Sequence, residues 1–293
     1  MRWRASDGAR ALRPQIDLAG LSVDGVSVGG FASCLDVPEL NLCVDLGVVL
    51  DRTIARDFVL VTHAHADHLG SLVQHVAQRR LRGMHPATYV VPPEIVGDVE
   101  ELLGIWRRLD GGALRAVVRP LEPGESFDLR RDLGVRPFET VHRVPSQGYL
   151  LERVSKRLAE EHRGIAPEAI AEMKREGVVV DEVVREPVIA ISGDTTIEGL
   201  TRNPEVLRAP RLVVEATFLD ELVDADKAEQ WGHIHLDHIA AIAERIECRA
   251  LLLNHVSARY SGAEARRLVD QRLPPDLAAR TQVMVAGVAP DHE

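Results

Sequence analysis

Four side chains that can bind metal ions or transfer protons lie within six consecutive positions. They are His63, His65, Asp67 and His68, in the segment Thr62–Gly70. His63 and His65 are two positions apart, so in extended backbone their side chains project to the same side and can bind one ion together. Asp67 and His68 follow after a turn and can reach a second ion nearby. Imidazole and carboxylate ligands without a thiolate suit zinc or a related divalent ion.

Three further candidate ligands follow apolar runs elsewhere in the chain. They are His142 after Val135–Val141, Asp194 after Val188–Ile191, and His255 after Leu251–Leu253. A carboxylate such as Asp194 can bridge two ions about 3.5–4 Å apart, and His142 and His255 would each complete the shell of one ion. Water or hydroxide held between such ions is a nucleophile at neutral pH. The remaining isolated histidines are more simply read as structural: His75, His85, His162, His238 and His292.

A further carboxylate, Glu215, ends the apolar run Leu212–Val214. Burial of an unpaired charge is costly, so Glu215 needs a partner, and the histidines of Trp231–His235 are the natural ones. A Glu–His pair fixes the imidazole tautomer and raises its basicity, which suits a general acid that protonates a leaving group. The alternative is a buried salt bridge with a purely structural role.

The elements that position these residues are predicted to be strands, because five apolar runs each end in a polar or ligand residue. Such runs fit strands buried on both faces, and sheets of this kind bind ligands at the carboxyl ends of their strands. The first run, Val59–Val61, should lead through the histidine cluster into a helix near Leu72. Further helices are expected at Pro93–Asp110, at Ile239–Ile246 with Asp237 as a candidate cap, and at Gly262–Leu273 with Ser261 and Glu264 at capping-box spacing.

Composition indicates a globular protein with a sizeable core: 293 residues, 45% hydrophobic and 27% charged. No apolar run approaches the ~18 residues of a membrane span, and Met1–Ala5 leads into polar residues without the apolar core of a signal peptide. The three cysteines, Cys34, Cys43 and Cys248, are odd in number and lack CxxC spacing, which predicts a reducing, cytoplasmic location.

Charge and aromatic content argue against a nucleic-acid coat. The net charge is −10, so a polyanionic substrate would need a local positive field, part of which bound metal could supply. Aromatic residues are only 4% of the chain, so stacking platforms for bases should be sparse.

Several motifs resemble those of a known family. The string His63–His68 resembles the metal motif of the metallo-β-lactamase superfamily. The later motifs resemble ribonuclease Z, the endonuclease that trims the 3′ trailer from precursor tRNA; they are Ser192–Thr195, Glu215–Phe218, Gly232-His233 and His255–Tyr260. The likeness covers about Leu18 to Gly287. It is strongest with the short, plant-type form, through Gly20–Ser22, Gly29-Gly30, Pro145–Tyr149 and Gly232–His235.

The resemblance implies an α/β fold: an αββα sandwich of two mixed β-sheets flanked by helices. A loose tail over 1–17 would precede a single domain over 18–293, with an arm inserted at about 151–186. Two Zn²⁺ ions are implied, with Mn²⁺ or another divalent ion as an alternative. One would be held by His63, His65 and His142, the other by Asp67, His68 and His255, with Asp194 as the bridge.

Catalytic roles also come from the resemblance. Asp67 would orient or deprotonate the attacking water, and Glu215 with His233 would protonate the leaving 3′ oxygen. His233 aligns with the family's histidine because it follows Gly232, whereas His235 stands where many members have threonine and stays an alternative donor.

The segment Leu151–Glu186 departs from the bacterial pattern because it lacks a Gly-Pro tip. It contains seven basic and nine acidic residues. Its early cations could form a positive face on a helical arm, or simply a solvated helix face. The candidate substrate-binding residues are Arg153, Lys156, Arg157, Arg163 and Arg259. The resemblance further implies a homodimer in which the arm of one subunit holds tRNA for the site of the other.

The leading hypothesis is therefore a dinuclear zinc endoribonuclease that acts on precursor tRNA and has no membrane partner. A second hypothesis keeps the site but assigns it a small phosphodiester such as a cyclic nucleotide. A third is an inactive RNA- or protein-binding module that keeps its metal for stability; such a module would not require the pair of Glu215 with His233.

Overall fold

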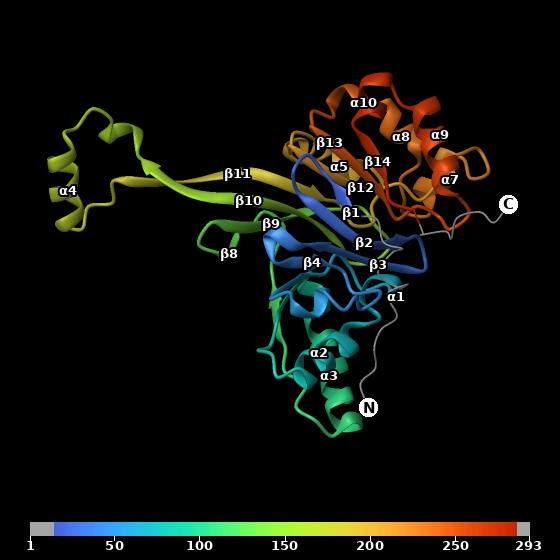
Figure 1. The fold of residues 1–293 in the computed structure, drawn as a ribbon, viewed down its shortest axis with the longest axis horizontal. Coiled ribbons are helices and arrows are strands. Elements are labelled where there is room, and N and C mark those ends of the chain that lie inside the picture. The colour runs from blue at the N-terminus through green and yellow to red at the C-terminus, as the bar shows by residue number, and fades with distance from the viewer. Residues whose placement is uncertain (1–14, 286–293) are drawn as a thin grey trace.

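The computed structural model describes residues 15–285. Two seven-stranded sheets each follow chain order (Figure 1). The first contains β1 (Gln15–Asp17), β2 (Ser22–Val28), β3 (Ala32–Val37), β4 (Leu42–Val44), β5 (Phe58–Leu60), β6 (Thr88–Val91) and β7 (Val117–Pro120). The second contains β8 (Phe127–Arg130), β9 (Leu133–Glu139), β10 (Gln147–Leu158), β11 (Asp181–Ile191), β12 (Arg211–Glu215), β13 (Ala250–Asn254) and β14 (Thr281–Val283). Both sheets are mixed: β1–β4 and β8–β11 pair antiparallel, and β4–β7 and β11–β14 pair parallel.

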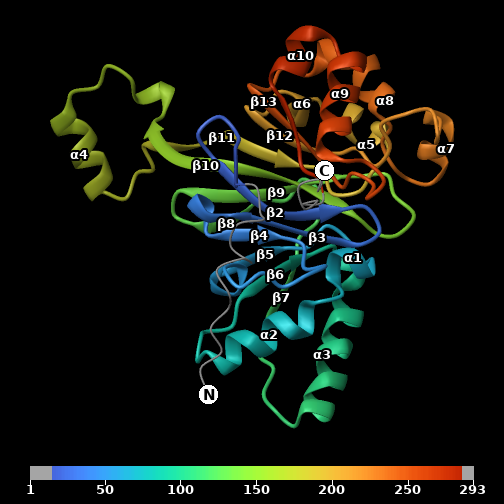
Figure 2. The ribbon, with the colours of Figure 1, turned by 45° about the vertical axis from the view of Figure 1, so that its right-hand side comes forward.

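Helices cover the outer face of each sheet, which confirms the expected αββα sandwich (Figure 2). The helices are α1 (Ala66–Leu69), α2 (Leu72–Leu81), α3 (Val96–Asp110), α4 (Pro167–Arg175), α5 (Ile197–Thr201), α6 (Pro204–Leu207), α7 (Ala225–Gln230), α8 (Leu236–Ala241), α9 (Gly262–Arg272) and α10 (Pro275–Ala279). Short 3₁₀ turns occur at Pro38–Leu40, Thr53–Ala55, Pro93–Ile95, Glu160–His162 and Ala243–Arg245. Among residues 15–285, no helix is both long enough and apolar enough to span a bilayer.

The central parallel strands β5, β12 and β13 are buried on both faces, as their continuous apolar runs predicted. In β5, Leu60 packs into the core between the sheets, and Val59 packs toward α2 and α3. In β12, Val213 faces the same inter-sheet core and its neighbours face the helices of the second half. Because successive side chains of a strand point to opposite faces, one apolar run serves two cores.

Two local predictions need correction, and a third is confirmed. Gln15–Asp17, the last part of the predicted tail, pairs with β2 as strand β1; residues 1–14 lie outside the described residues. Asp237 does not cap the helix predicted at Ile239–Ile246: α8 begins earlier, and His235 is its N-cap, accepting a hydrogen bond from the Asp237 N–H. The Ser261 side chain does cap α9, accepting from the Glu264 N–H.

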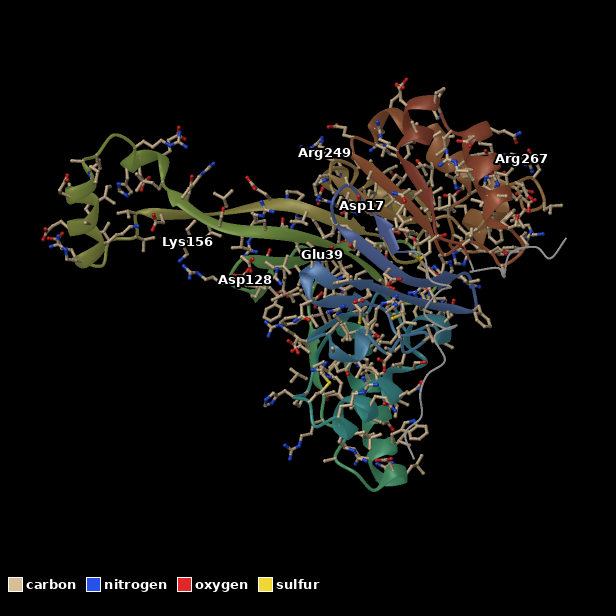
Figure 3. All side chains as sticks on the ribbon, in the orientation of Figure 1. Asp17, Glu39, Asp128, Lys156, Arg249 and Arg267 are labelled. Atoms are coloured by element: carbon tan, nitrogen blue, oxygen red, sulfur yellow. The ribbon has the colours of Figure 1, made fainter. Side chains whose placement is uncertain are left out.

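Strands β10 and β11 extend beyond the sheet as a long hairpin that carries α4 at its far end, which we call the arm (Figures 1 and 2). The 12 residues of β10 span roughly 36 Å at about 3.3 Å per residue. The interpretation of a helical arm with one positive face is wrong here, because Arg153, Lys156 and Arg157 lie on β10. In a strand, Lys156 projects to the face opposite the two arginines; Figure 3 shows Lys156 on the arm.

Candidate metal centre

Every candidate ligand lies where a strand ends at one common edge of the sandwich. His63 follows β5, and α1 begins directly after His65, which places Asp67 and His68 in that short helix. His142, Asp194 and His255 follow β9, β11 and β13. All seven predicted ligands are therefore brought together, although they come from positions almost 200 residues apart.

The first group of ligand atoms contains three histidines and one aspartate. His65 Nδ1 lies 3.0 Å from His63 Nε2 and 3.3 Å from His142 Nε2. His63 Nε2 lies 3.8 Å from Asp194 Oδ2. The ligand atoms of His63, His65, His142 and Asp194 all lie within 4.8 Å of one another. Three ring nitrogens and a carboxylate oxygen at these distances are a suitable shell for one divalent ion.

The second group contains Asp67, His68 and His255. His255 Nε2 lies 3.4 Å from Asp67 Oδ2, and His68 Nε2 lies 3.7 Å from the same oxygen. Asp194 also reaches this group: its Oδ1 is 3.4 Å from His68 Nε2 and its Oδ2 is 3.4 Å from His255 Nε2. Asp194 therefore lies between the two groups, where a bridging carboxylate is needed.

Outer hydrogen bonds fix the rings of His63 and His68. The Thr62 hydroxyl donates to the Asp45 carboxylate at 2.9 Å, so its oxygen accepts from His63 Nδ1 at 3.0 Å. His68 Nδ1 donates directly to Asp45 Oδ2 at 2.7 Å. In each neutral imidazole, the Nε2 lone pair is then left facing the centre.

The rings of His142 and His255 are fixed in the same way. His142 Nδ1 donates to the Gly232 carbonyl oxygen at 2.9 Å. The Thr217 hydroxyl donates to Glu215 Oε2 at 2.9 Å and accepts from His255 Nδ1 at 2.9 Å. The imidazoles of His63, His68, His142 and His255 therefore each present an Nε2 lone pair to one region. All four atoms are acceptors, so they cannot hydrogen bond to one another.

The residues fit a divalent metal site by a second test, which concerns unpaired atoms. Within residues 15–285, His68 Nε2 and Asp194 Oδ1 are buried, and neither has a hydrogen-bond partner. Buried polar atoms without partners are rare and need an explanation. Both atoms face the ligand groups, where a cation would satisfy them, and the donor set of nitrogen and oxygen suits zinc and related ions.

Burial and charge shift the proton affinities of the ligands in opposite directions. Burial, with His68 beside it, holds the pKa of His63 well below its usual range. Burial also disfavours the charged form of His68, but the nearby Asp194 and Asp45 carboxylates outweigh it and raise its pKa to about 9. For Asp194, burial would raise the pKa, but the surrounding histidines outweigh it and hold the pKa well below the usual range. The centre therefore favours ionised carboxylates.

Asp45, Thr62 and Thr217 were missed by the sequence interpretation. Asp45 follows the buried strand β4, so the rule that found the other ligands applies to it as well. Thr62 directly precedes the histidine cluster and gave no separate signal. Thr217 could be found only from the fold, because its two partners, Glu215 and His255, come from different strands.

We predict that Asp45→Asn weakens metal binding about 10- to 100-fold, because an outer carboxylate that orients a ligand histidine has effects of this size. Competition with a chromophoric chelator measures the affinity. Asp51→Asn, at a side chain that is 87% exposed, is the matched control and should bind metal like the parent. Unchanged metal affinity in the Asp45 variant would contradict the orienting role.

Glu215 and His233 form the expected pair beside the ligands. His233 Nδ1 donates to Glu215 Oε1 at 3.0 Å. The buried carboxylate also accepts from the N–H groups of Thr195, Ile234 and Thr217 and from the Thr217 hydroxyl, which compensates its burial. Burial would lower the pKa of His233, but Glu215 outweighs this and raises it. His235 caps α8, and its Nε2 donates to the Asp220 carbonyl oxygen instead.

The candidate substrate-binding cations do not lie together. Arg259 is exposed near the centre, with its guanidinium carbon 5.5 Å from the centroid of the Phe218 ring. Arg153, Lys156, Arg157 and Arg163 lie on the arm. Five of the seven arm cations pair with carboxylates: Arg157, Arg163, Lys174, Arg175 and Arg185. For Arg153 and Lys156, the part of the chain that the structure describes contains no ion-pair partner.

Comparison with known proteins places this geometry in a family. Residues 48–256 match the model of the Beta-lactamase superfamily domain. The tRNase Z TRZ2, chloroplastic, of Arabidopsis thaliana is 40% identical over 259 residues, 88% of this chain and 73% of that protein. The tRNase Z TRZ1 of the same plant is 37% identical over 274 residues, 93% of this chain and 98% of that protein. Human tRNase Z, short form (ELAC1), shares the fold, with a TM-score of 0.56 and 19% identity over 80% of this chain and 92% of that chain.

The chain therefore belongs to the β-lactamase superfamily, whose sandwich and clustered histidines and aspartates define a metal-dependent hydrolase. Within that superfamily it belongs to the tRNase Z, or ribonuclease Z, family. The resemblance inferred from the sequence motifs is confirmed.

Proposed function

We propose that this protein is an endoribonuclease that removes the 3′ trailer from precursor tRNA with two zinc ions. The observation that carries the proposal is the position of His233. Its Nδ1 is bonded to Glu215, and its ring stacks on that of the ligand His255 at 5.4 Å between centroids. A proton donor held beside a metal centre is what cleavage of a phosphodiester requires. The relatives that are 37–40% identical are named tRNase Z.

The residues have distinct tasks in this proposal. His63, His65 and His142 would hold one zinc ion, Asp67, His68 and His255 the other, and Asp194 would bridge them. When bound, the ions polarise the phosphate and lower the pKa of a water molecule. Asp67, whose side chain is 15% exposed, would orient or deprotonate the attacking water. His233, kept oriented by Glu215, donates a proton to the leaving 3′ oxygen.

The decisive experiment is incubation of the metal-loaded protein with a precursor tRNA transcript, with the cut end mapped with and without a chelator. We expect one cut after the acceptor stem that the chelator abolishes. Competition with excess cyclic nucleotide tests the rival substrate class. Faster turnover of the small diester at matched concentration would overturn the assignment to tRNA, and so would full cleavage after chelation.

A homodimer is part of the proposal, and the arm supports it. β11 runs from the arm tip to its own metal centre, so the tip lies at the far end of that strand (Figure 1). RNA held by one arm would therefore be presented to a second subunit.

The face of α3 supplies a candidate contact for the dimer, with exposed Leu102, Ile105, Trp106 and Leu109 beside a groove of about 340 Å³ against α2. Exposed apolar patches of this kind mark interaction sites.

We predict that Leu109→Glu converts the protein to a monomer. The Leu109 side chain is 70% exposed, so the change should not disturb the fold, but it places a charge in the proposed contact. Light scattering after gel filtration gives the mass, and cleavage of precursor tRNA should fall at least about tenfold because the arm acts across the dimer. Leu222→Glu, at a side chain that is 76% exposed elsewhere, is the control. An unchanged mass would refute this contact.

Arg153 and Lys156 are proposed to contact RNA phosphates, since the other arm cations already have carboxylate partners. We predict that the double alanine variant raises KM for precursor tRNA and lowers the slope of log affinity against log salt by about 2, with kcat unchanged. Arg157→Ala removes a cation paired with Glu182 and should have a smaller effect. An identical salt slope in the double variant would exclude phosphate contact.

We also propose a cytoplasmic location. The three cysteines Cys34, Cys43 and Cys248 are free and buried, which suits a reducing compartment.

A further inference from the structure

An exposed aromatic residue lies two positions before the proposed proton donor in the chain. Trp231 follows α7 and immediately precedes Gly232 and His233. Its side chain is 39% exposed, although the chain is poor in aromatic residues. Tryptophan rings on the surface are a usual platform for stacking nucleic-acid bases.

The ring belongs to a compact cluster of aromatic and basic side chains. The Trp231 and Phe218 rings are 5.5 Å apart between centroids, and the Phe218 and His233 rings are 6.3 Å apart. Lys227 Nζ lies 5.0 Å from the Trp231 ring centroid, and the Arg259 guanidinium lies 5.5 Å from that of Phe218. Lys227 and Arg259 are both exposed. The cluster thus combines two neighbouring rings with two exposed cations, each of which lies over one of the rings.

The backbone holds this cluster in a fixed relation to the metal centre. The Trp231 N–H donates to the carbonyl oxygens of Lys227 and Ala228, which ends α7 at this residue. Gly232 follows with a φ of 82°, and its carbonyl oxygen accepts from the ligand His142. A Cβ at Gly232 would lie 2.9 Å from His142 Nδ1, so the chain passes close against the ligand. The Trp231 ring is therefore positioned by the same turn that positions His233.

We propose that Trp231, Lys227 and Arg259 bind the nucleotide that carries the leaving 3′ oxygen, the last nucleotide of the tRNA body. The base stacks on the Trp231 ring, and the cations contact the phosphate on its 5′ side. This inference rests on the proposed function, which assigns His233 to that oxygen. A group that protonates an oxygen must lie within hydrogen-bond reach of it. The nucleotide that carries the leaving oxygen therefore lies beside His233 and near the Trp231 ring.

The test uses two precursor tRNA transcripts, one intact and one with an abasic nucleotide 5′ of the cut. We expect Trp231→Ala to lower kcat/KM on the intact precursor about 5- to 150-fold, the range that stacking on an aromatic side chain supplies. Trp231→Phe should recover most of the rate. On the abasic precursor the parent, Trp231→Ala and Trp231→Phe should converge, because no base remains to stack. Glu229→Ala, an exposed change on the same helix, should match the parent on both precursors.

Other outcomes would overturn the inference. An equal loss on both precursors would show that Trp231 only positions His233, and equal rates for all variants on the intact precursor would show that no base is bound there. The double variant Lys227→Ala, Arg259→Ala should reduce the salt dependence of kcat/KM. An unchanged salt dependence would show that these two cations do not contact the phosphate. Failure of the proposed function is distinguishable, because the parent protein would then cleave neither precursor.

Discussion

The His65→Ala variant is expected to lose about 10³-fold or more of its cleavage rate on precursor tRNA, because its ring nitrogen joins two other histidines in the first ligand group. His65 is the best ligand to remove. It is only partly buried, and its hydrogen-bond contacts are to other ligands, so the fold should survive. The bound metal per chain, measured by elemental analysis, should fall as well.

His85→Ala is the matched control for this change. His85 is exposed, and among the described residues it bonds through its backbone carbonyl oxygen, which accepts from Arg79 and is kept in alanine. Circular dichroism and the thermal midpoint should be alike in both variants. A His65→Ala protein that keeps its metal and cuts at the parent rate would refute the ligand assignment.

Replacement of His233 by alanine should lower kcat about 10²- to 10⁴-fold, the usual contribution of a positioned general acid. Metal content should stay at the parent value, because in this proposal His233 donates a proton and does not hold an ion. The measurement that separates these roles is metal per chain beside single-turnover cleavage. Loss of metal would instead make His233 a ligand, which its proximity to Asp194 and His255 permits.

His235→Asn is the companion variant, because His235 is the alternative donor. Asparagine is a good N-cap residue and can keep the hydrogen bond that His235 accepts from the Asp237 N–H at the start of α8. We expect this variant to retain kcat near the parent value. A large loss of kcat in this variant, with kcat of His233→Ala unchanged, would identify His235 as the proton donor in place of His233.

The positions of the ligands were predictable because a local pattern carried them. An apolar run that ends in Asp194, Glu215 or His255 is a buried strand that ends at a shared sheet edge, and the fold supplies the rest. The same pattern holds for Asp45, which ends β4 and bonds to His68. The outer bond from His142 to the Gly232 carbonyl oxygen could not be predicted, since a backbone acceptor 90 positions away has no sequence signature.

Two errors have a clear physical origin. The arm was expected to be helical because its residues are polar and charged, but the outer part of β10 leaves the core, and its strand structure comes from pairing with β11. Without a buried face, no hydrophobic alternation marks it. The start of α8 was misplaced because a histidine, His235, takes the capping position that aspartate usually occupies.

The two oxygens of Glu215 face different partners, and this restricts what can replace it. Oε1 accepts from His233 Nδ1 and two backbone N–H groups, and Oε2 accepts from the Thr217 side chain that in turn holds His255. A carboxamide has one acceptor oxygen, so glutamine at this position would present its amino group to one of the two sets of donors. Aspartate is shorter by a methylene and could not reach both sets. The site therefore has no conservative substitute at position 215, and any exchange there would disturb the acid and a metal-binding imidazole together.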